Sequence, residues 1–153
     1  MQHFEHPEDV LNHFSIYGSL TVADFGSGMG FFSIPAAKHL SNEGTVFAID
    51  IQEEPLRVLR RAAREQHLHN IHTLRGDLET PRGSHIKNES VDRLIITNVL
   101  FQAENKTAIL KEAYRVLKKG GTLIVAEWHS HERTPLGPRR EHRIDSGQLR
   151  TML

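Results

Sequence analysis

The sequence contains no cysteine, and this absence removes several kinds of chemistry. A chain without thiols can form no disulfide, no thiolate zinc site and no cysteine nucleophile. Because it needs no disulfide, the chain fits a reducing compartment, and we expect a cytoplasmic location. His129, His131 and Glu132 stand close together in a polar segment, but they do not make the closed ligand set of a zinc site. We therefore predict no metal ion.

Long apolar runs and an excess of either charge are also missing. No stretch approaches the roughly 18 apolar residues that span a bilayer. The N-terminus has neither a basic start nor the apolar core of a signal peptide. Lys plus Arg and Asp plus Glu balance at 19 each, so the formal net charge of zero creates no overall field that attracts nucleic acid. These absences predict no membrane insertion and no nucleic-acid partner.

The 153 residues contain enough apolar material, 38% of the chain, for a single domain with a hydrophobic core. Three segments have helical patterning, and Gly120 and Gly121 are expected to stop the last of them. Apolar and β-branched runs predict buried strands between them. The predicted helices are residues 31–40, 53–67 and 105–119, and the predicted strands are residues 20–25, 44–50, 70–77, 91–100 and 121–128. Strands that alternate with helices predict a parallel α/β sheet.

The two ends of the chain lie outside this alternation. Residues 7–17 predict a helix, because Pro7 suits a first turn and apolar residues recur at helical spacing. We expect residues 1–18 to cover the sheet. Residues 129–145 are rich in proline, glycine and charge, which predicts a loop on the substrate side, and residues 145–153 begin another helix.

The stretch "VADFGSGMGFF" places Gly26, Gly28 and Gly30 directly between a predicted strand and a predicted helix. Such a turn exposes backbone N–H groups at the helix start, and glycines let a ligand approach the main chain without a clash at Cβ. The usual occupant of this place in a doubly wound sheet is a nucleotide-like ligand, bound across the carboxyl ends of the strands. The motif therefore predicts a nucleotide-like ligand.

Three carboxylates stand where such a ligand would meet the other strands. Asp50 ends the second strand, where a carboxylate can accept hydrogen bonds from both hydroxyls of a ribose. Asp77 follows the third strand and is expected near an adenine amino group. Asp24, two residues before Gly26, is expected to hold the loop or to bind a ligand ammonium group. The agreement in position of these features favours a binding site more than any one of them alone.

The glycine spacing is G-x-G-x-G rather than the dinucleotide pattern G-x-G-x-x-G. With an acid two residues upstream, it resembles the first motif of the class I S-adenosylmethionine-dependent methyltransferases. Four further stretches resemble later motifs of that family: "VFAID", "GDLE", "SVDRLIITNVLFQ" and "EAYRVLKKGGTLIVAEW". The resemblance covers roughly residues 4–153 and is greatest to small methyltransferases related to the quinone-biosynthesis group. It implies a doubly wound, Rossmann-like, mostly parallel α/β sheet with strand order 3-2-1-4-5.

The resemblance also implies a cofactor, S-adenosyl-L-methionine, with S-adenosyl-L-homocysteine as the product. The three glycines would pack against its methionine and ribose portion, Asp24 would lie near its amino group and Asp50 would bind the ribose hydroxyls. Ile51 would lie against the adenine, and Asn98 would lie beside the methionine moiety. The full predicted cofactor-binding set is Asp24, Gly26, Ser27, Gly28, Gly30, Asp50, Ile51, Gly76, Asp77, Leu78 and Asn98.

The chain departs from the family at its C-terminus. Members normally continue through the last helix into an antiparallel hairpin, strands six and seven, that closes the sheet edge. No such strands follow Leu153, so we expect a chain that is truncated at its C-terminus or an edge that a partner supplies. The predicted fifth strand would be an open edge, and a homo-oligomer is one way to cover it.

The expected reaction is in-line transfer of a methyl group to a small-molecule acceptor, accelerated mostly by orientation. A catalytic base is optional and none is assigned. The candidates for it are Asn98, Gln102, Glu127 and His129. Phe101 and Trp128 are expected to line the pocket. Phe31 and Phe32, at the helix start, are expected to pack in the core, with a place beside the cofactor as the alternative for either.

Other functions are less well supported by the motifs. Nucleic-acid base methyltransferases of the amide-directed type carry prolines after the asparagine at this place, whereas Val99 and Leu100 follow Asn98 here. Arsenic methylation, an activity of other similar proteins, depends on cysteines, and this chain has none. A nicotinamide-dependent oxidoreductase is disfavoured by the glycine spacing and by the lack of a recognisable Tyr-Lys catalytic pair. A catalytically silent cofactor-binding or scaffold domain stays open as an alternative because of the missing sheet edge.

Overall fold

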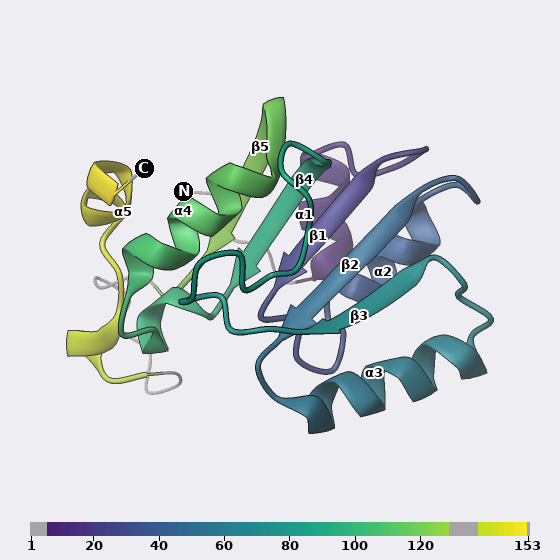
Figure 1. Ribbon diagram of the computed structural model, residues 1–153, viewed down its shortest axis with the longest axis horizontal. Coiled ribbons are helices and arrows are strands. Elements are labelled where there is room, and N and C mark those ends of the chain that lie inside the picture. Colours follow the sequence, from purple (N-terminus) through teal and green to yellow (C-terminus); the bar gives the residue numbers. More distant parts are fainter. Residues whose placement is uncertain (1–5, 129–137, 153) are drawn as a thin grey trace.

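A computed structural model describes residues 6–128 and 138–152 of the chain. Five strands form one sheet in the order β3-β2-β1-β4-β5, and every neighbouring pair is parallel (Figure 1). The strands are β1 Thr21–Phe25, β2 Thr45–Asp50, β3 Ile71–Arg75, β4 Val91–Thr97 and β5 Leu117–Ala126. The predicted fold class and strand order are confirmed. Within the described ranges no antiparallel hairpin follows β5.

Helices cover both faces of the sheet. In Figure 1, α4 lies in front of β4 and β5, whereas α1 and α2 lie behind the sheet. The helices are α1 Pro7–His13, α2 Ser33–His39, α3 Glu53–Glu65, α4 Lys106–Val116 and α5 Ser146–Met152, with short 3₁₀ turns η1 Leu100–Gln102 and η2 Arg140–His142. Pro7 opens α1, and Val10 and Leu11 bury the inner face of this helix in the core behind the sheet.

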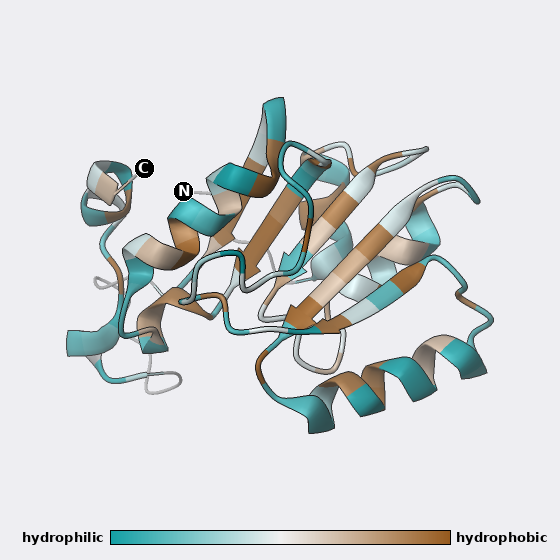
Figure 2. Cartoon of the chain, viewed as in Figure 1, coloured by the Kyte–Doolittle hydropathy of each residue, from teal (hydrophilic) through white to brown (hydrophobic). Residues whose placement is uncertain are grey.

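Alternating residues of the central strands supply two separate cores. Leu94 and Ile96 of β4 belong to the cluster that contains the buried residues of α4, whereas Ile95 between them belongs to the cluster of α1 and α2. All three are fully buried, and burial of each such side chain contributes about 1.5–3 kcal/mol. Figure 2 shows β1, β2 and β4 mostly white to brown, whereas α3 and α4 are striped with hydrophilic and hydrophobic residues. The two cores fix the sheet between its helices.

The boundary between α4 and β5 differs from the prediction. The helix ends at Val116 and the strand begins at once, so the glycines at positions 120 and 121 lie inside β5 and do not stop the helix. Leu117 pairs with Val91, and the Lys118 ammonium lies 2.8 Å from the Asp92 carboxylate, which holds this early part of the strand to β4. Gly120, with φ +79°, lies where the pairing register shifts. The long-range pairing outweighs the local helical pattern.

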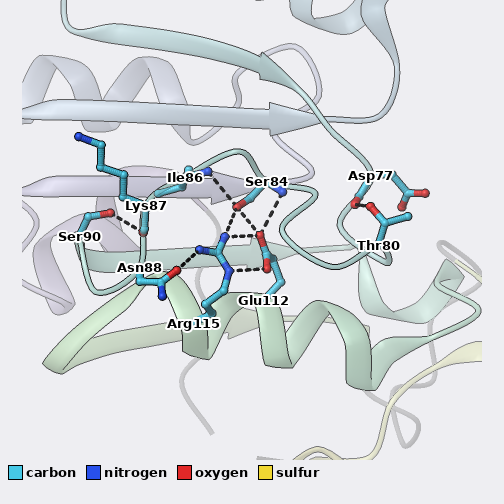
Figure 3. A network of polar contacts seen from close by, with 9 residues as sticks. All are labelled: Asp77, Thr80, Ser84, Ile86, Lys87, Asn88, Ser90, Glu112 and Arg115. Carbon is cyan, nitrogen blue, oxygen red and sulfur yellow. Dashed lines mark hydrogen bonds and ion pairs between the residues drawn. The ribbon is translucent and has the colours of Figure 1, made fainter.

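A polar network fastens the loop at residues 78–90 to α4 (Figure 3). The Glu112 carboxylate accepts hydrogen bonds from the Ser84 hydroxyl at 2.5 Å and from the Arg115 guanidinium at 2.6 Å. Arg115 also donates to the side chain of Asn88 at 2.6 Å. Burial opposes the charge of Glu112, but the hydrogen bonds from Arg115 and Ser84 outweigh it and lower the pKa of this carboxyl to about 2. Glu112 therefore stays ionised and holds the loop.

The anchored loop closes back on the end of β3. Gly83 donates its N–H to the Thr80 carbonyl at 3.0 Å, and the Thr80 hydroxyl donates to the Asp77 carbonyl at 2.8 Å. A Cβ on Gly83 would clash with that same Asp77 carbonyl, so only glycine fits. The network in α4 thus sets the position of Asp77 through the loop.

We expect Glu112→Gln to lower the free energy of unfolding by about 1–3 kcal/mol, because Arg115 and Ser84 lose a charged, buried acceptor. The wild-type contribution is complete above pH 4.5 and is lost as pH falls toward the folded pKa of about 2, so the difference between the two proteins should shrink in acid. Urea denaturation at several pH values measures it. Glu65→Gln, at an exposed ion pair with Arg61, is the matched control and should change little. Equal effects of the two substitutions would contradict the role given to the network.

Candidate functional site

The predicted site residues meet at one edge of the sheet. Parallel pairing aligns Asp24 with Ala48 and Ile95, so the ends of β1, β2 and β4 come together. Asp50 is the last residue of β2, and Asn98 follows β4 directly. The edge therefore gathers polar groups that are far apart in the sequence.

A cleft of about 290 Å³ opens at this edge. Seven predicted cofactor-binding residues line it: Gly26, Asp50, Ile51, Gly76, Asp77, Leu78 and Asn98. The other four, Asp24, Ser27, Gly28 and Gly30, are not among its lining residues and belong to β1 and the glycine turn beside it. The sequence did not single out six further lining residues as part of a cofactor site: Gln52, Glu79, Val99, Gln102, Ala103 and Ile109. Their one sequence signal is that most of them follow predicted strand ends.

Two other hollows lie near the sheet. One, of about 400 Å³, continues from Ile51, Gly76 and Asp77 toward Arg82. The other, of about 700 Å³, includes Thr45 at the start of β2 and lies at the opposite edge of the sheet. It contains none of the predicted site residues. Only the edge at the carboxyl ends combines a cleft with the motif residues in the described part of the chain.

The three glycines of the turn have different reasons to be glycine. All have positive φ, at +74° for Gly26, +53° for Gly28 and +93° for Gly30. A Cβ on Gly26 would clash with the Val99 side chain, and one on Gly30 would clash with Leu59. A Cβ on Gly28 would meet nothing within 4 Å. The protein's own side chains fill the space at two positions, and only Gly28 leaves the main chain open to a ligand.

Asp50 ties the glycine turn to β2. One carboxylate oxygen accepts the Gly28 N–H at 2.9 Å, and the other accepts the Gln52 N–H at 2.9 Å. The N–H groups of Gly26 and Ser27 both donate hydrogen bonds to the carbonyl of Ile49, the residue before Asp50 in β2. These bonds also hold the turn against β2. Each carboxylate oxygen has further lone pairs, so Asp50 can still accept hydrogen bonds from a ligand.

Asp24 is buried beneath the turn, with only 2% of its surface exposed. The Ser33 hydroxyl donates to its carboxylate at 2.6 Å. Burial raises the pKa of Asp24 to about 6; the Ser33 hydrogen bond opposes this rise and the nearby Asp50 charge adds to it. The Ser27 hydroxyl is also buried and has no hydrogen-bond partner in the described chain. A raised pKa and an unpartnered hydroxyl are features that gather at functional sites.

The turn after β4 holds Asn98 with φ +55°, a left-handed conformation that is uncommon for a residue with a side chain. Its N–H donates to the Ala126 carbonyl at 3.0 Å, and Gln102 donates to its carbonyl at 3.3 Å. Glu127, named above as a candidate base, instead accepts the Val99 N–H at 2.8 Å. One oxygen of this carboxylate is thus engaged in fixing the backbone.

The structure agrees with only part of what was expected of the aromatic residues. Phe32 packs in the core as expected, but the prediction for Phe31 was wrong: it is 68% exposed and meets the edge of the Phe32 ring. Neither Phe101 nor Trp128 lines the 290 Å³ cleft. The Arg143 guanidinium lies 5.8 Å from the centre of the Trp128 ring, a cation–π contact. No local sequence pattern indicates this contact.

The expected substrate-side loop at residues 129–145 is described only from residue 138 onward, and His129, His131 and Glu132 lie outside the described residues. Within residues 6–128 and 138–152, no group of His, Asp and Glu side chains is placed to hold a metal ion. The helices of the same ranges are all too short or too polar to cross a bilayer.

Comparison with known proteins adds three kinds of likeness. A family profile described as a methyltransferase domain matches residues 17–150. The demethylmenaquinone methyltransferase of Listeria welshimeri serovar 6b is 30% identical over 122 residues, which are 79% of this chain and 50% of that protein. The arsenite methyltransferase of Halobacterium salinarum is 29% identical over 108 residues, which are 70% of this chain and 27% of that protein.

The solved structure of a SAM-dependent methyltransferase from Aquifex aeolicus has the same fold, with a TM-score of 0.84 and 26% sequence identity. The match covers 95% of this chain and 76% of that one. The chain spans about half the length of the curated demethylmenaquinone methyltransferases that it matches.

Asp24→Asn tests the buried carboxyl in the absence of any ligand. Because the pKa of Asp24 is about 6 in the folded chain against the usual 3.8, the folded state binds this proton more tightly than the unfolded state. The ionised carboxylate therefore costs stability as pH rises through that interval, by about 3 kcal/mol in total. We expect the free energy of unfolding of the variant, relative to wild type, to rise by about that amount between pH 4 and pH 7. Denaturant titrations at several pH values measure this difference. If the free energies of unfolding of the two proteins change in parallel with pH, the raised pKa of Asp24 is contradicted.

Proposed function

Because the chain belongs to the methyltransferase-domain family, among the class I S-adenosylmethionine-dependent methyltransferases related to the quinone-biosynthesis group, we propose that it transfers a methyl group to a small-molecule acceptor. The observation that carries the proposal is the cleft where Asp50, Asp77 and Asn98 converge.

The residues at the cleft fit S-adenosylmethionine. Asp50 keeps lone pairs for the two hydroxyls of a ribose, and Ile51, which is 55% exposed, offers an apolar surface to an adenine ring. The open face of Gly28 lets a ligand reach the main chain. The buried Ser27 hydroxyl and the Asp24 carboxyl lie under the same turn and suit a polar, cationic amino-acid group. The cofactor supplies a methyl group already activated on a sulfonium.

The chain's own contribution is then to hold and orient. A turn that hydrogen bonds fix at the carboxyl edge of the sheet can hold reacting groups in line, and orientation of this kind is worth about 7–11 kcal/mol in favourable cases. No described side chain is assigned as a base. Asp50 and Asp77 are assigned to binding, and one oxygen of Glu127 is occupied by backbone N–H groups.

The relatives support a small acceptor in two ways. The names of the Listeria and Halobacterium proteins refer to demethylmenaquinone and to arsenite, and both are small molecules rather than nucleic acids or proteins. The present chain has no cysteine, which leaves no thiolate to bind an arsenic atom. An organic acceptor of the quinol type is therefore favoured over arsenite.

Isothermal titration calorimetry with S-adenosylhomocysteine tests the cofactor site. We expect the wild-type chain to bind it and NADH not to bind, because Asp50 and the glycine turn match an adenosine joined to an amino acid. Asp50→Ala should weaken binding about tenfold or more, since two charge-assisted hydrogen bonds to the ribose are lost. Glu54→Ala removes a nearby exposed carboxylate that does not line the cleft and should leave affinity unchanged.

Absence of S-adenosylhomocysteine binding, or preference for NADH, would contradict the proposed function. Cofactor binding without methyl transfer to any of a panel of small quinols and phenols would instead favour the catalytically silent cofactor-binding domain.

Gly28→Ala and Gly18→Ala form a matched pair. Both glycines have positive φ and open space where the substitution adds a methyl group, so each substitution should cost about 1–2 kcal/mol of stability from backbone strain alone. Of the two, only Gly28 belongs to the glycine turn beside the cleft, where its N–H donates to Asp50. Only its substitution should therefore weaken S-adenosylhomocysteine binding, by about tenfold. Equal affinities of the two variants would show that the ligand does not approach Gly28.

A further inference from the structure

Glu127 joins the end of β5 to the turn that follows β4. One oxygen, Oε1, accepts the Val99 N–H at 2.8 Å and the Leu100 N–H at 2.6 Å. These two residues come immediately after Asn98, at the start of η1. Because the N–H groups at a helix start have no partner within the helix, a carboxylate is a suitable acceptor for them. Glu127 therefore fixes the backbone at one wall of the cleft.

The turn that Glu127 holds contains a residue with a left-handed backbone, Asn98. Asparagine tolerates this conformation better than other residues with a side chain, and surrounding contacts hold it in place. The Asn98 N–H bond to the Ala126 carbonyl provides one such contact, and the Glu127 carboxylate provides the next two along the chain. Without the carboxylate, the Val99 and Leu100 N–H groups lose the side-chain acceptor that the structure gives them.

Val99 packs directly against the glycine turn, so its position determines that of the turn. The Val99 side chain fills the space that a Cβ on Gly26 would occupy, so the two residues are in close contact. Both also line the 290 Å³ cleft. A shift of Val99 would therefore move or free Gly26, and with it the turn that Asp50 holds through Gly28.

The second carboxylate oxygen, Oε2, is buried and has no hydrogen-bond partner in the described chain. Burial raises the pKa of Glu127, and the backbone N–H groups of Leu100, Val99 and Phe101 oppose the rise. A buried carboxylate oxygen without a hydrogen-bond partner costs stability. The presence of the Glu127 carboxylate is explained if the position of the turn matters more for ligand binding than the stability that the carboxylate costs.

We propose that Glu127 is a positioning residue for the cofactor, which acts by holding Val99 against Gly26 and so keeps the glycine turn and the Asn98 wall in binding geometry. It rests on the proposed function, and it gives Glu127 a role distinct from that of a catalytic base.

The test compares Glu127→Ala, Glu127→Asp and Glu127→Gln by calorimetry with S-adenosylhomocysteine and by amide hydrogen exchange at Val99 and Leu100. Removal or shortening of the side chain should raise Kd about tenfold or more and speed exchange at both amides. Glu127→Gln should recover most of the affinity, because the amide carbonyl can accept the same N–H groups. If the alanine variant does not fold, the aspartate variant decides.

Asn105→Ala is the matched control. Asn105 caps α4 by accepting the Ala108 N–H at 3.1 Å, but it does not line the cleft. Its removal should lower the free energy of unfolding by about 1 kcal/mol, as loss of a helix cap does, and leave Kd unchanged. If wild type binds the ligand and the alanine and aspartate variants bind it equally well, or if Asn105→Ala weakens binding as much as they do, the role of Glu127 is overturned. Failure of wild type to bind would instead overturn the proposed function.

Discussion

Parallel pairing of β1 with both β2 and β4 is the constraint on which the site depends. Because the three strands run in the same direction, their carboxyl ends lie at one edge, and residues separated by more than seventy positions become neighbours there. The buried residues of β1 and β4 alternate between two cores, so a slip of one residue would exchange their faces and displace Asp24. The same packing that stabilises the sheet therefore sets the register of the site.

The glycine turn is built as much by the protein as for a ligand. Val99 and Leu59 occupy the space beside Gly26 and Gly30, and Asp50 binds the backbone between them. A turn that is held from both sides before any ligand arrives loses little conformational freedom on binding. Asp24, buried under this turn with a raised pKa, adds a charge that the bare protein holds only at a cost. The site therefore combines a fixed backbone with a buried carboxylate, and a cationic ligand can offset the stability that this charge costs.

Much of this arrangement could be predicted from the sequence, and the remainder depends on contacts between distant residues. Apolar runs predicted the strands, and the acid at the end of each run placed Asp50 and Asp77 at the edge of the cleft. The start of β5 was not predicted, because Leu117 and Lys118 continue a helical pattern and only their pairing with β4 makes them a strand. The packing of Val99 on Gly26 has no local sequence signal. Phe31 was expected in the core from its place at the helix start, but its side chain is exposed.

A crystal structure of this chain with S-adenosylhomocysteine tests most directly whether the cleft binds the cofactor. We expect ligand density in the 290 Å³ cleft, with the ribose hydroxyls hydrogen-bonded to Asp50, the adenine between Ile51 and Asp77, and the amino-acid end over Gly28. Density in the 700 Å³ groove at the opposite edge of the sheet, or a ligand that leaves Asp50 without a contact, would contradict it.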